Sequence, residues 1–541
     1  MSRYCCPGTA DHCIDVSPLL GDGPLYAAPG GGQAGRRGRV RACICRGILG
    51  FPFRNRPPLH RHPDPTAMET EQLLHHLRRR LQTLAAAVSD HDGHVSISLD
   101  IPAPSGPADI AGCEDCLYWA RPADGRLRLA AGRIVVAEAA GPRRFAVLEH
   151  ALRRFRRGWR RLAPDGRGVD DALFCGFAFG EQPHRVQQTG GLANSLLFLP
   201  EALLVRENET ARLVFSCRGG QALEPVLENW LYRARQLLAP AGGGAGPGAT
   251  APAPLLPVAG DPGDWTPRVE RALAAIAGGR FDKLVISRRL RVDLPAGFRL
   301  QRMLDWLQPR YPRCTQFAVR NGGYTLVGVS PERLASLRGR RLQVDAIGGS
   351  CARGAGAAED RRLAAQLLHD AKSLREHRLV VEQIAALLEP LSAGLVCPDR
   401  PGLLRLPTVQ HLYSLIGAQL RAGVSLLQLA SVLHPTPAVG GQPRRAALDW
   451  LLANGEQERG WYSGALGWLD PDGGGELAVI LRCGLLGQQQ AELYAGAGIV
   501  AGSEPQQEFV ETGWKLHTMI EALQAGAARP EPRRSRRPGT G

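Results

Sequence analysis

Residues 493–519 read LYAGAGIVAGSEPQQEFVETGWKLHTM, an apolar strand-like run with a glycine cluster that leads into a helix. The helix is expected to follow residues 503–505, and its positions i, i+3 and i+7 share one face. That face is polar and carries Glu508, Glu511 and Lys515. The glycines leave backbone N–H groups open to a small carboxylate. They lack the G-x-G-x-x-G spacing, and the chain contains no P-loop motif, so dinucleotide or ATP binding is not indicated.

A second informative stretch is FDKLVISRRLRV at residues 281–292, which predicts a strand with Lys283, Val285 and Ser287 on one face. Lysine is rare in this chain: of 66 basic residues only three are lysine, at positions 283, 372 and 515. A desolvated amine can lose its proton near neutrality, whereas a guanidinium cannot. Each lysine is therefore a candidate for a site that needs an amine, with drift in composition as the alternative.

A long helix is expected over residues 359–391, where Lys372 and Glu376 lie four residues apart on one face. Carboxylates on two separate helices, without a histidine or cysteine pattern, suit a hard cation that prefers oxygen ligands. Mg²⁺ is the natural candidate. The alternative is that each glutamate lies on a solvated helix face in an ordinary i, i+4 pair.

The composition is that of a soluble globular protein, with 541 residues of which 44% are hydrophobic and 22% charged. No apolar run is long enough to span a membrane, and the first residues lack a signal-peptide pattern. The net charge of +15 is concentrated in residues 1–67, which contribute +5, and 529–541, which contribute +4. The remainder is too weak for a nucleic-acid-binding stripe. The 13 cysteines do not suggest a disulfide framework. We expect a cytoplasmic protein that binds neither membrane nor nucleic acid; the alternative class is an Arg-rich-tailed nucleic-acid-binding scaffold.

Composition also divides the chain. Residues 1–67 show no helical or strand period and are expected to be a disordered or non-native tail, with the working protein beginning near Met68. Residues 238–264 are rich in Pro, Gly and Ala and predict a linker. The linker separates a β-rich N-terminal part, 68–237, from a C-terminal part, 265–525, that holds all three lysines; residues 526–541 form a basic tail.

Eight blocks between residues 266 and 525 resemble, in the right order, the chorismate-utilising enzymes and specifically isochorismate synthases. The blocks are FDKLVISR (281–288), VGVSPERLASL (327–337), AIGGSCARG (346–354), KSLREHRLVVEQI (372–384), VQHLYSLI (409–416), LHPTPAVGGQPR (433–444), the run from RGWYSGALGW to LRCGLL (459–486), and the opening stretch (493–519). Residues 68–235 resemble the variable N-terminal part of the salicylate-pathway type, through the CLYW segment at 116–119.

The resemblance implies the α+β chorismate-binding fold, similar to anthranilate synthase component I and salicylate synthase, with large antiparallel sheets packed together and helices outside. It also implies a Mg²⁺-dependent, reversible conversion of chorismate to isochorismate, in which water adds at ring C2 as the hydroxyl leaves C4. The product would feed salicylate and siderophore or menaquinone biosynthesis. The working form implied is a monomer without a glutaminase subunit.

The resemblance also implies roles for particular residues. Lys283 would be the base that activates water, and Glu332 the acid that protonates the leaving hydroxyl. Glu376 and Glu511 would hold Mg²⁺, with Glu508 as a water-mediated partner. The substrate-binding residues would be Tyr462 and Arg482 for the enolpyruvyl carboxylate, helped by the Gly498 amide, Gly349 and Ser350 near the ring, and His411 and Lys515 along the pocket wall.

The chain departs from the family pattern at two places: Ser373 stands where siderophore-type relatives often carry Asp, and GGS replaces the usual AGT at residues 348–350. The ammonia-using relatives typically carry LVDLARNDL where this chain reads LVVEQIAAL. Salicylate synthase, which continues to pyruvate elimination, remains an alternative, although the small Ala438 fits the isochorismate-releasing type better.

Overall fold

The protein is described here by a computed structural model that covers residues 70–84, 88–104, 110, 113, 115–165, 172–182, 189–239, 257–259, 264–294 and 297–527. The chain divides into two units, residues 1–67 and 68–541, and every described residue belongs to the second unit. The predicted N-terminal tail and all but the first two residues of the predicted basic tail lie outside the described residues. Of the described helices, none combines the length and the apolar character needed to cross a membrane.

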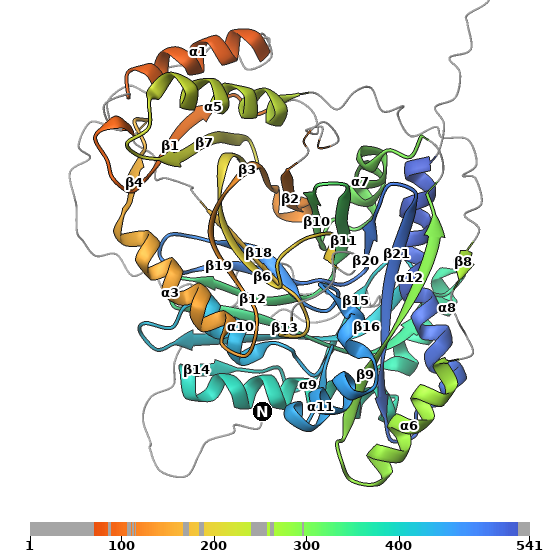
Figure 1. The fold of residues 1–541 in the computed structure, drawn as a ribbon. Coiled ribbons are helices and arrows are strands. Elements are labelled where there is room, and N and C mark those ends of the chain that lie inside the picture. Colours follow the sequence, from red (N-terminus) through yellow and green to blue (C-terminus); the bar gives the residue numbers. More distant parts are fainter. Residues whose placement is uncertain are drawn as a thin grey trace, which may run out of the picture. The chain divides into compact units, whose positions relative to one another are not determined.

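The N-terminal part contributes seven strands and three α-helices within the described ranges (Figure 1). The strands are β1 (His94–Ile101), β2 (Cys116–Arg121), β3 (Arg126–Ala139), β4 (Trp159–Leu162), β5 (Leu173–Phe177), β6 (Ser195–Glu207) and β7 (Thr210–Arg218). The helices are α1 (Thr70–Gln82), α3 (Arg144–Arg157) and α5 (Leu223–Leu238). Helix α1 packs on α5 because its residues Leu73, Leu77 and Leu81 form one apolar stripe. Helix α5 in turn packs on β3, β6 and β7.

The C-terminal part supplies the remaining elements. Its strands are β8 (Pro257–Ala259), β9 (Lys283–Asp293), β10 (Thr315–Asn321), β11 (Tyr324–Ser330), β12 (Arg333–Arg338), β13 (Arg341–Ala352), β14 (Ser392–Val396), β15 (Gly402–Arg405), β16 (Val409–Leu420), β17 (Gly441–Gln442), β18 (Ala465–Leu469), β19 (Gly475–Val479), β20 (Cys483–Leu486) and β21 (Gln490–Val500). Its α-helices are α6 (Trp265–Ala277), α7 (Leu300–Arg310), α8 (Ala357–Leu367), α9 (Ala371–Leu388), α10 (Leu426–Leu433), α11 (Arg444–Ala453) and α12 (Pro505–Ala527).

The strands of the described ranges join in one hydrogen-bonded network, antiparallel in every pair except β1 with β4. Strand β2 pairs with β10, and β5 pairs with β18, so the sheet runs without a break from the N-terminal part into the C-terminal part. Helices pack against its faces, as α9 does on β13 and α12 on β21. This confirms the predicted α+β class with large antiparallel sheets and outer helices.

The proposed division of the chain stays a prediction. Helix α5 ends at Leu238, where the predicted linker begins, but residues 240–256 and 260–263 of that linker lie outside the described residues. Residues Pro257–Ala259 form β8, which pairs with β9.

The long helix expected over residues 359–391 is wrong, because the structure has two helices there. Helix α8 ends at Leu367, and α9 begins at Ala371 with Asp370 as its N-cap. The Asp370 side chain accepts a hydrogen bond from the Ser373 backbone N–H at 2.7 Å, which satisfies a free donor of the first turn. Apolar periodicity continues across the break, so it hides the new start.

Two strands and two helices, β9, β21, α9 and α12, carry three of the quoted sequence blocks and lie together in the fold. Strand β9 pairs with β21 along its length, so that Val285 lies opposite Gly498. Helix α12 packs on β21, with Lys515 of its polar face donating to Gly496 O at 2.8 Å, while α9 crosses the glycine end of β13. A cavity lies at this meeting point.

Candidate active site

A cavity of about 70 Å³ lies between the ends of β9, β13 and β21 and the helices α9 and α12. Nine of the twelve residues proposed from the sequence line it: Glu332, Gly349, Ser350, Glu376, His411, Tyr462, Arg482, Gly498 and Lys515. The other three do not line the cavity. Lys283 and Glu511 form ion pairs with the lining residues Glu376 and Lys515, whereas Glu508 pairs with Lys372, which does not line it either. The sequence therefore identifies residues that are more than 200 positions apart in the chain and close together in the fold.

The three lysines of the chain each pair with one of the three glutamates proposed as metal ligands. Lys283 Nζ lies 2.9 Å from Glu376 Oε1, and its side chain is almost fully buried. Lys372 Nζ lies 2.6 Å from Glu508 Oε1. Lys515 Nζ lies 2.6 Å from Glu511 Oε1, one turn earlier in α12. Lys372 and Glu376, which were expected on one helix face, do not pair with each other as the alternative of ordinary i, i+4 pairs would have it; each pairs with a residue on another element.

The electrostatics show that these pairs form one cluster. Burial lowers the pKa of Lys372, but the charges of Glu508, Glu376 and Glu511 outweigh it and leave that pKa above its usual value. Burial and the neighbouring Glu511 charge raise the pKa of Glu508. Burial also raises the pKa of Glu376, but the charges of Lys283, Lys515 and Lys372 outweigh it and leave that pKa below its usual value. Three carboxylates thus lie close enough to influence one another.

Hard oxygen donors from two helices suit Mg²⁺, which is commonly held by one or two carboxylates together with waters and substrate oxygens. The donor set of this cluster fits that chemistry. Within the described residues, however, no three acidic, histidine or cysteine side chains stand in a ready-made ligand arrangement, because lysine ammonium groups contact the carboxylate oxygens. A metal would therefore take the place of ammonium groups on these oxygens.

Glycine is required at two places beside the Lys283–Glu376 pair. A Cβ at Gly498 would lie 2.3 Å from Glu376 Oε1 and 3.2 Å from Lys283 Cε, so any side chain would displace the pair. Gly349 has a φ of +72° and donates its N–H to Glu376 Oε2 at 3.1 Å. Gly349 thus orients the Glu376 carboxylate, and Gly498 leaves room for it.

Glu332 is a buried carboxyl group, and its Oε1 atom has no hydrogen-bond partner among the described residues. Burial and the charge of Asp345 raise its pKa to about 8, although Lys283, Thr436 and Lys515 act in the opposite direction. A carboxyl group with this pKa is largely protonated at neutral pH and can donate a proton to a bound ligand. This is the state that the proposed acid requires.

Arg482, His411 and Ser350 form a hydrogen-bonded chain along another wall. Arg482 Nη2 donates to His411 Nε2 at 2.8 Å, and Ser350 Oγ lies 2.9 Å from His411 Nδ1. Burial and the Arg482 charge hold the pKa of His411 well below its usual value, so the ring is neutral. Within the part of the chain that the structure describes, Arg482 Nη1 is buried without a hydrogen-bond partner, although a buried donor costs free energy unless it is paired. A ligand carboxylate would satisfy it, as the proposed role requires.

Sequence reasoning missed several residues that support the pocket. Asp345 and Thr436 act on Glu332, as described above. Arg459 is fully buried and donates to Glu456, to Val439 O at 2.7 Å and to a carbonyl of β9. The sequence did contain a signal for Asp345, which is a charged residue within the otherwise apolar and glycine-rich run at 344–349. Arg459 follows three polar or charged residues, so its surroundings in the sequence do not mark it as buried.

The chain belongs to the chorismate-binding enzymes, whose family model, described as chorismate binding enzyme, matches residues 83–524. Among its relatives is the salicylate biosynthesis isochorismate synthase of Pseudomonas aeruginosa, which is 36% identical over 84% of this chain and 95% of that protein. A solved structure of MenF, the menaquinone-specific isochorismate synthase from Escherichia coli, matches with a TM-score of 0.68 and 25% identity, over 83% of this chain and 99% of that one.

Anthranilate synthase component I from Streptococcus pneumoniae shares the fold, with a TM-score of 0.59 and 21% identity over 73% of this chain and 92% of that one. The predicted resemblance and the predicted chorismate-binding fold are both confirmed.

Proposed function

We propose that the protein is an isochorismate synthase that converts chorismate reversibly to isochorismate. The observation that carries this function is the single cavity that holds a carboxyl group in its acid form, Glu332, beside the buried Lys283–Glu376 pair. The reaction needs a base for the incoming water and an acid for the departing hydroxyl. Glu332, a carboxyl group with a raised pKa on the cavity wall, and Lys283, an amine paired with the lining residue Glu376, supply both.

In this proposal Lys283 first loses its ammonium proton and then, as the free amine, accepts a proton from the water that attacks C2. Glu332 donates its proton to the hydroxyl that leaves C4, which departs as water. Arg482 binds the enolpyruvyl carboxylate through its free Nη1, with Tyr462 and the Gly498 amide beside it. His411, Ser350 and Gly349 line the ring region, and their contacts with one another keep that wall rigid.

Mg²⁺ is the proposed cofactor, held by Glu376 and Glu511 with Glu508 as a water-mediated partner. When bound, it supplies positive charge for the ring carboxylate of the substrate. The charge balance of the cluster supports this set, because each of the three glutamates is paired with a lysine ammonium group. That the chain works as a monomer without a glutaminase subunit stays a prediction.

The test is a product assay. Purified protein is incubated with chorismate and Mg²⁺, and the products are separated and identified by NMR; a parallel reaction contains EDTA. We expect isochorismate in a fixed ratio to chorismate, approached from either compound, and no product with EDTA. Salicylate as the main product would assign the protein to the salicylate synthases, and anthranilate in the presence of ammonia would reject the hydroxyl-transfer reaction.

A further inference from the structure

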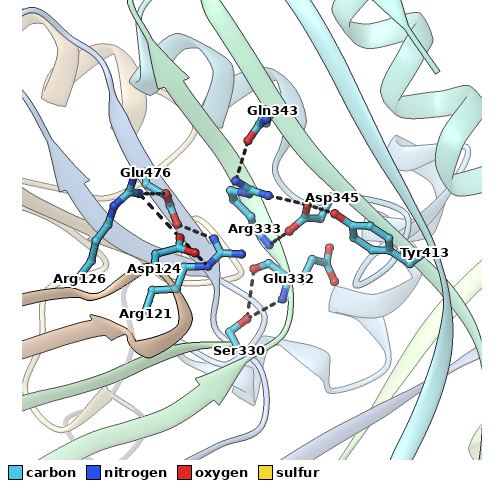
Figure 2. Close-up of polar contacts among 10 residues, drawn as sticks. All are labelled: Arg121, Asp124, Arg126, Ser330, Glu332, Arg333, Gln343, Asp345, Tyr413 and Glu476. Carbon is cyan, nitrogen blue, oxygen red and sulfur yellow. Dashed lines mark hydrogen bonds and ion pairs between the residues drawn. The ribbon is translucent and has the colours of Figure 1, made fainter. Parts of the chain in front are cut away.

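Asp345 is a buried aspartate on β13 whose contacts converge on the residue next to Glu332 (Figure 2). Its Oδ2 atom accepts the Arg333 backbone N–H at 2.9 Å, and Oδ1 accepts from the Arg333 guanidinium at 3.1 Å. The Tyr413 hydroxyl donates to the same Oδ1 at 3.0 Å. A carboxylate with three such donors is fixed in position.

The backbone of Glu332 is held on both sides. Ser330 Oγ lies 3.2 Å from both the N–H and the carbonyl oxygen of Glu332, and the Val479 N–H donates to that carbonyl at 3.0 Å. Asp345 holds the N–H that follows. The side chain of Glu332 therefore leaves a rigid corner of the sheet, and Figure 2 shows it on the side where Asp345 and Tyr413 lie.

The groups that face Glu332 come from four elements. Lys283 approaches from β9, Lys515 from α12 and the Thr436 hydroxyl from the loop after α10, and all three favour the ionised carboxylate. Asp345 on β13 is the negative charge that acts against them. The Arg333 guanidinium, which pairs with Asp345, also donates to Gln343 at 2.9 Å and does not contact Glu332.

We propose that Asp345 is a positioning residue for the acid step, which fixes the backbone beside Glu332 and holds a negative charge near its carboxyl group. This inference rests on the proposed function. In the step it serves, the Glu332 O–H bond breaks, the proton passes to the C4 hydroxyl, and the C4–O bond breaks to release water. The proton taken from the attacking water by Lys283 balances the one that Glu332 gives up.

The experiment measures kcat for chorismate against pH in the wild-type enzyme and in Asp345→Asn. The loss of one negative charge makes Glu332 a stronger acid, so the alkaline limb of the profile moves to lower pH by about one unit. Above that limb kcat then falls about tenfold relative to wild type. Glu476→Gln is the matched control, because Glu476 is an equally buried carboxylate in the same arginine cluster that pairs with Arg121 and does not act on Glu332 (Figure 2).

Two further variants separate charge from structure. Tyr413→Phe removes a hydrogen bond to Asp345 but keeps its charge, so the alkaline limb should stay near its wild-type position. If Asp345→Asn does not fold because it leaves Arg333 unpaired, the double variant Arg333→Gln/Asp345→Asn removes both charges and should still move the limb downward.

The outcomes are distinguishable from a failure of the proposed function. An unmoved alkaline limb in a folded enzyme without the Asp345 charge overturns the inference. Full turnover by Glu332→Gln, in contrast, rejects Glu332 as the acid and with it the proposed mechanism. A shift of equal size in Glu476→Gln also overturns the inference, because it would show that any lost charge in the cluster has this effect.

Discussion

Replacing Glu332 by Gln should make the protein more stable and much less active. The carboxyl group has an ordinary pKa of 4.5 and a pKa of about 8 in the folded protein, because burial and Asp345 disfavour its charge. The folded state therefore holds a proton that the unfolded state has lost between these two pH values. Stability is unaffected below pH 4.5, falls as the pH rises toward 8, and then levels off.

The size of the effect follows from the shift. Each pH unit in this window costs ~1.4 kcal/mol, so at pH 7 the wild-type protein loses roughly 3 kcal/mol that the glutamine variant keeps. With ~2.1 cal/mol/K of unfolding entropy per residue and about 410 described residues, this corresponds to a rise of about 3.5 °C in Tm. Glutamine has nearly the same shape and cannot ionise, so packing changes little.

The assay is the Tm of both proteins by differential scanning fluorimetry between pH 5.5 and 9, without substrate. The difference should grow with pH up to about pH 8. A matched control is Glu476→Gln, which removes a carboxylate ion-paired with Arg121 and should lower Tm. A difference between wild type and Glu332→Gln that is constant with pH, or that shrinks as pH rises, would refute the reasoning.

Three further predictions concern the lysine–glutamate cluster. Lys283→Ala should lose most turnover while calorimetry still detects binding of chorismate and Mg²⁺; full activity would exclude this lysine as the base. Gly498→Ala should cut kcat at least tenfold, because its Cβ would strike Glu376, whereas Gly513→Ala, with open space around its Cβ, should not; equal activities would contradict the packing argument. Lys372→Met should lower Tm without metal, because it leaves Glu508 unpaired. Added Mg²⁺ should then raise Tm more in this variant than in the wild type. An equal rise in both proteins would show that Lys372 does not balance the negative charge of the cluster.

Local patterns predicted much of the fold. Strand β9 was expected at residues 281–292 and is found at Lys283–Asp293, and the last helix begins at Pro505 as its preceding residues indicated. These elements have strong periodicity and clear end signals. The break between α8 and α9 was missed because it depends on one capping side chain, Asp370, within an uninterrupted apolar period.

The pocket residues were found through motif order, whereas their partners were not. Lys372 and Glu376 were expected on one face of a helix, but nothing in the sequence indicated that Lys372 pairs with Glu508 on α12. Asp345 was not identified, because its influence on Glu332 depends on how β13 lies beside the start of β12, and register between strands is set by tertiary packing. Sequence patterns define which side chains share a face of one element, but not which face of another element they meet.

The scarcity of lysine in this chain now has a physical explanation in terms of geometry. An ammonium group is a compact charge that contacts one carboxylate oxygen, whereas a guanidinium binds a carboxylate through a planar fork with two parallel hydrogen bonds. A lysine partner therefore leaves the second oxygen of each glutamate available and can move aside on a flexible stem. At Glu376 that second oxygen accepts the Gly349 N–H, so the carboxylate keeps its orientation when its lysine partner moves away. Elsewhere, at ion pairs that need only be held firmly, such as Arg333 with Asp345, the chain uses arginine.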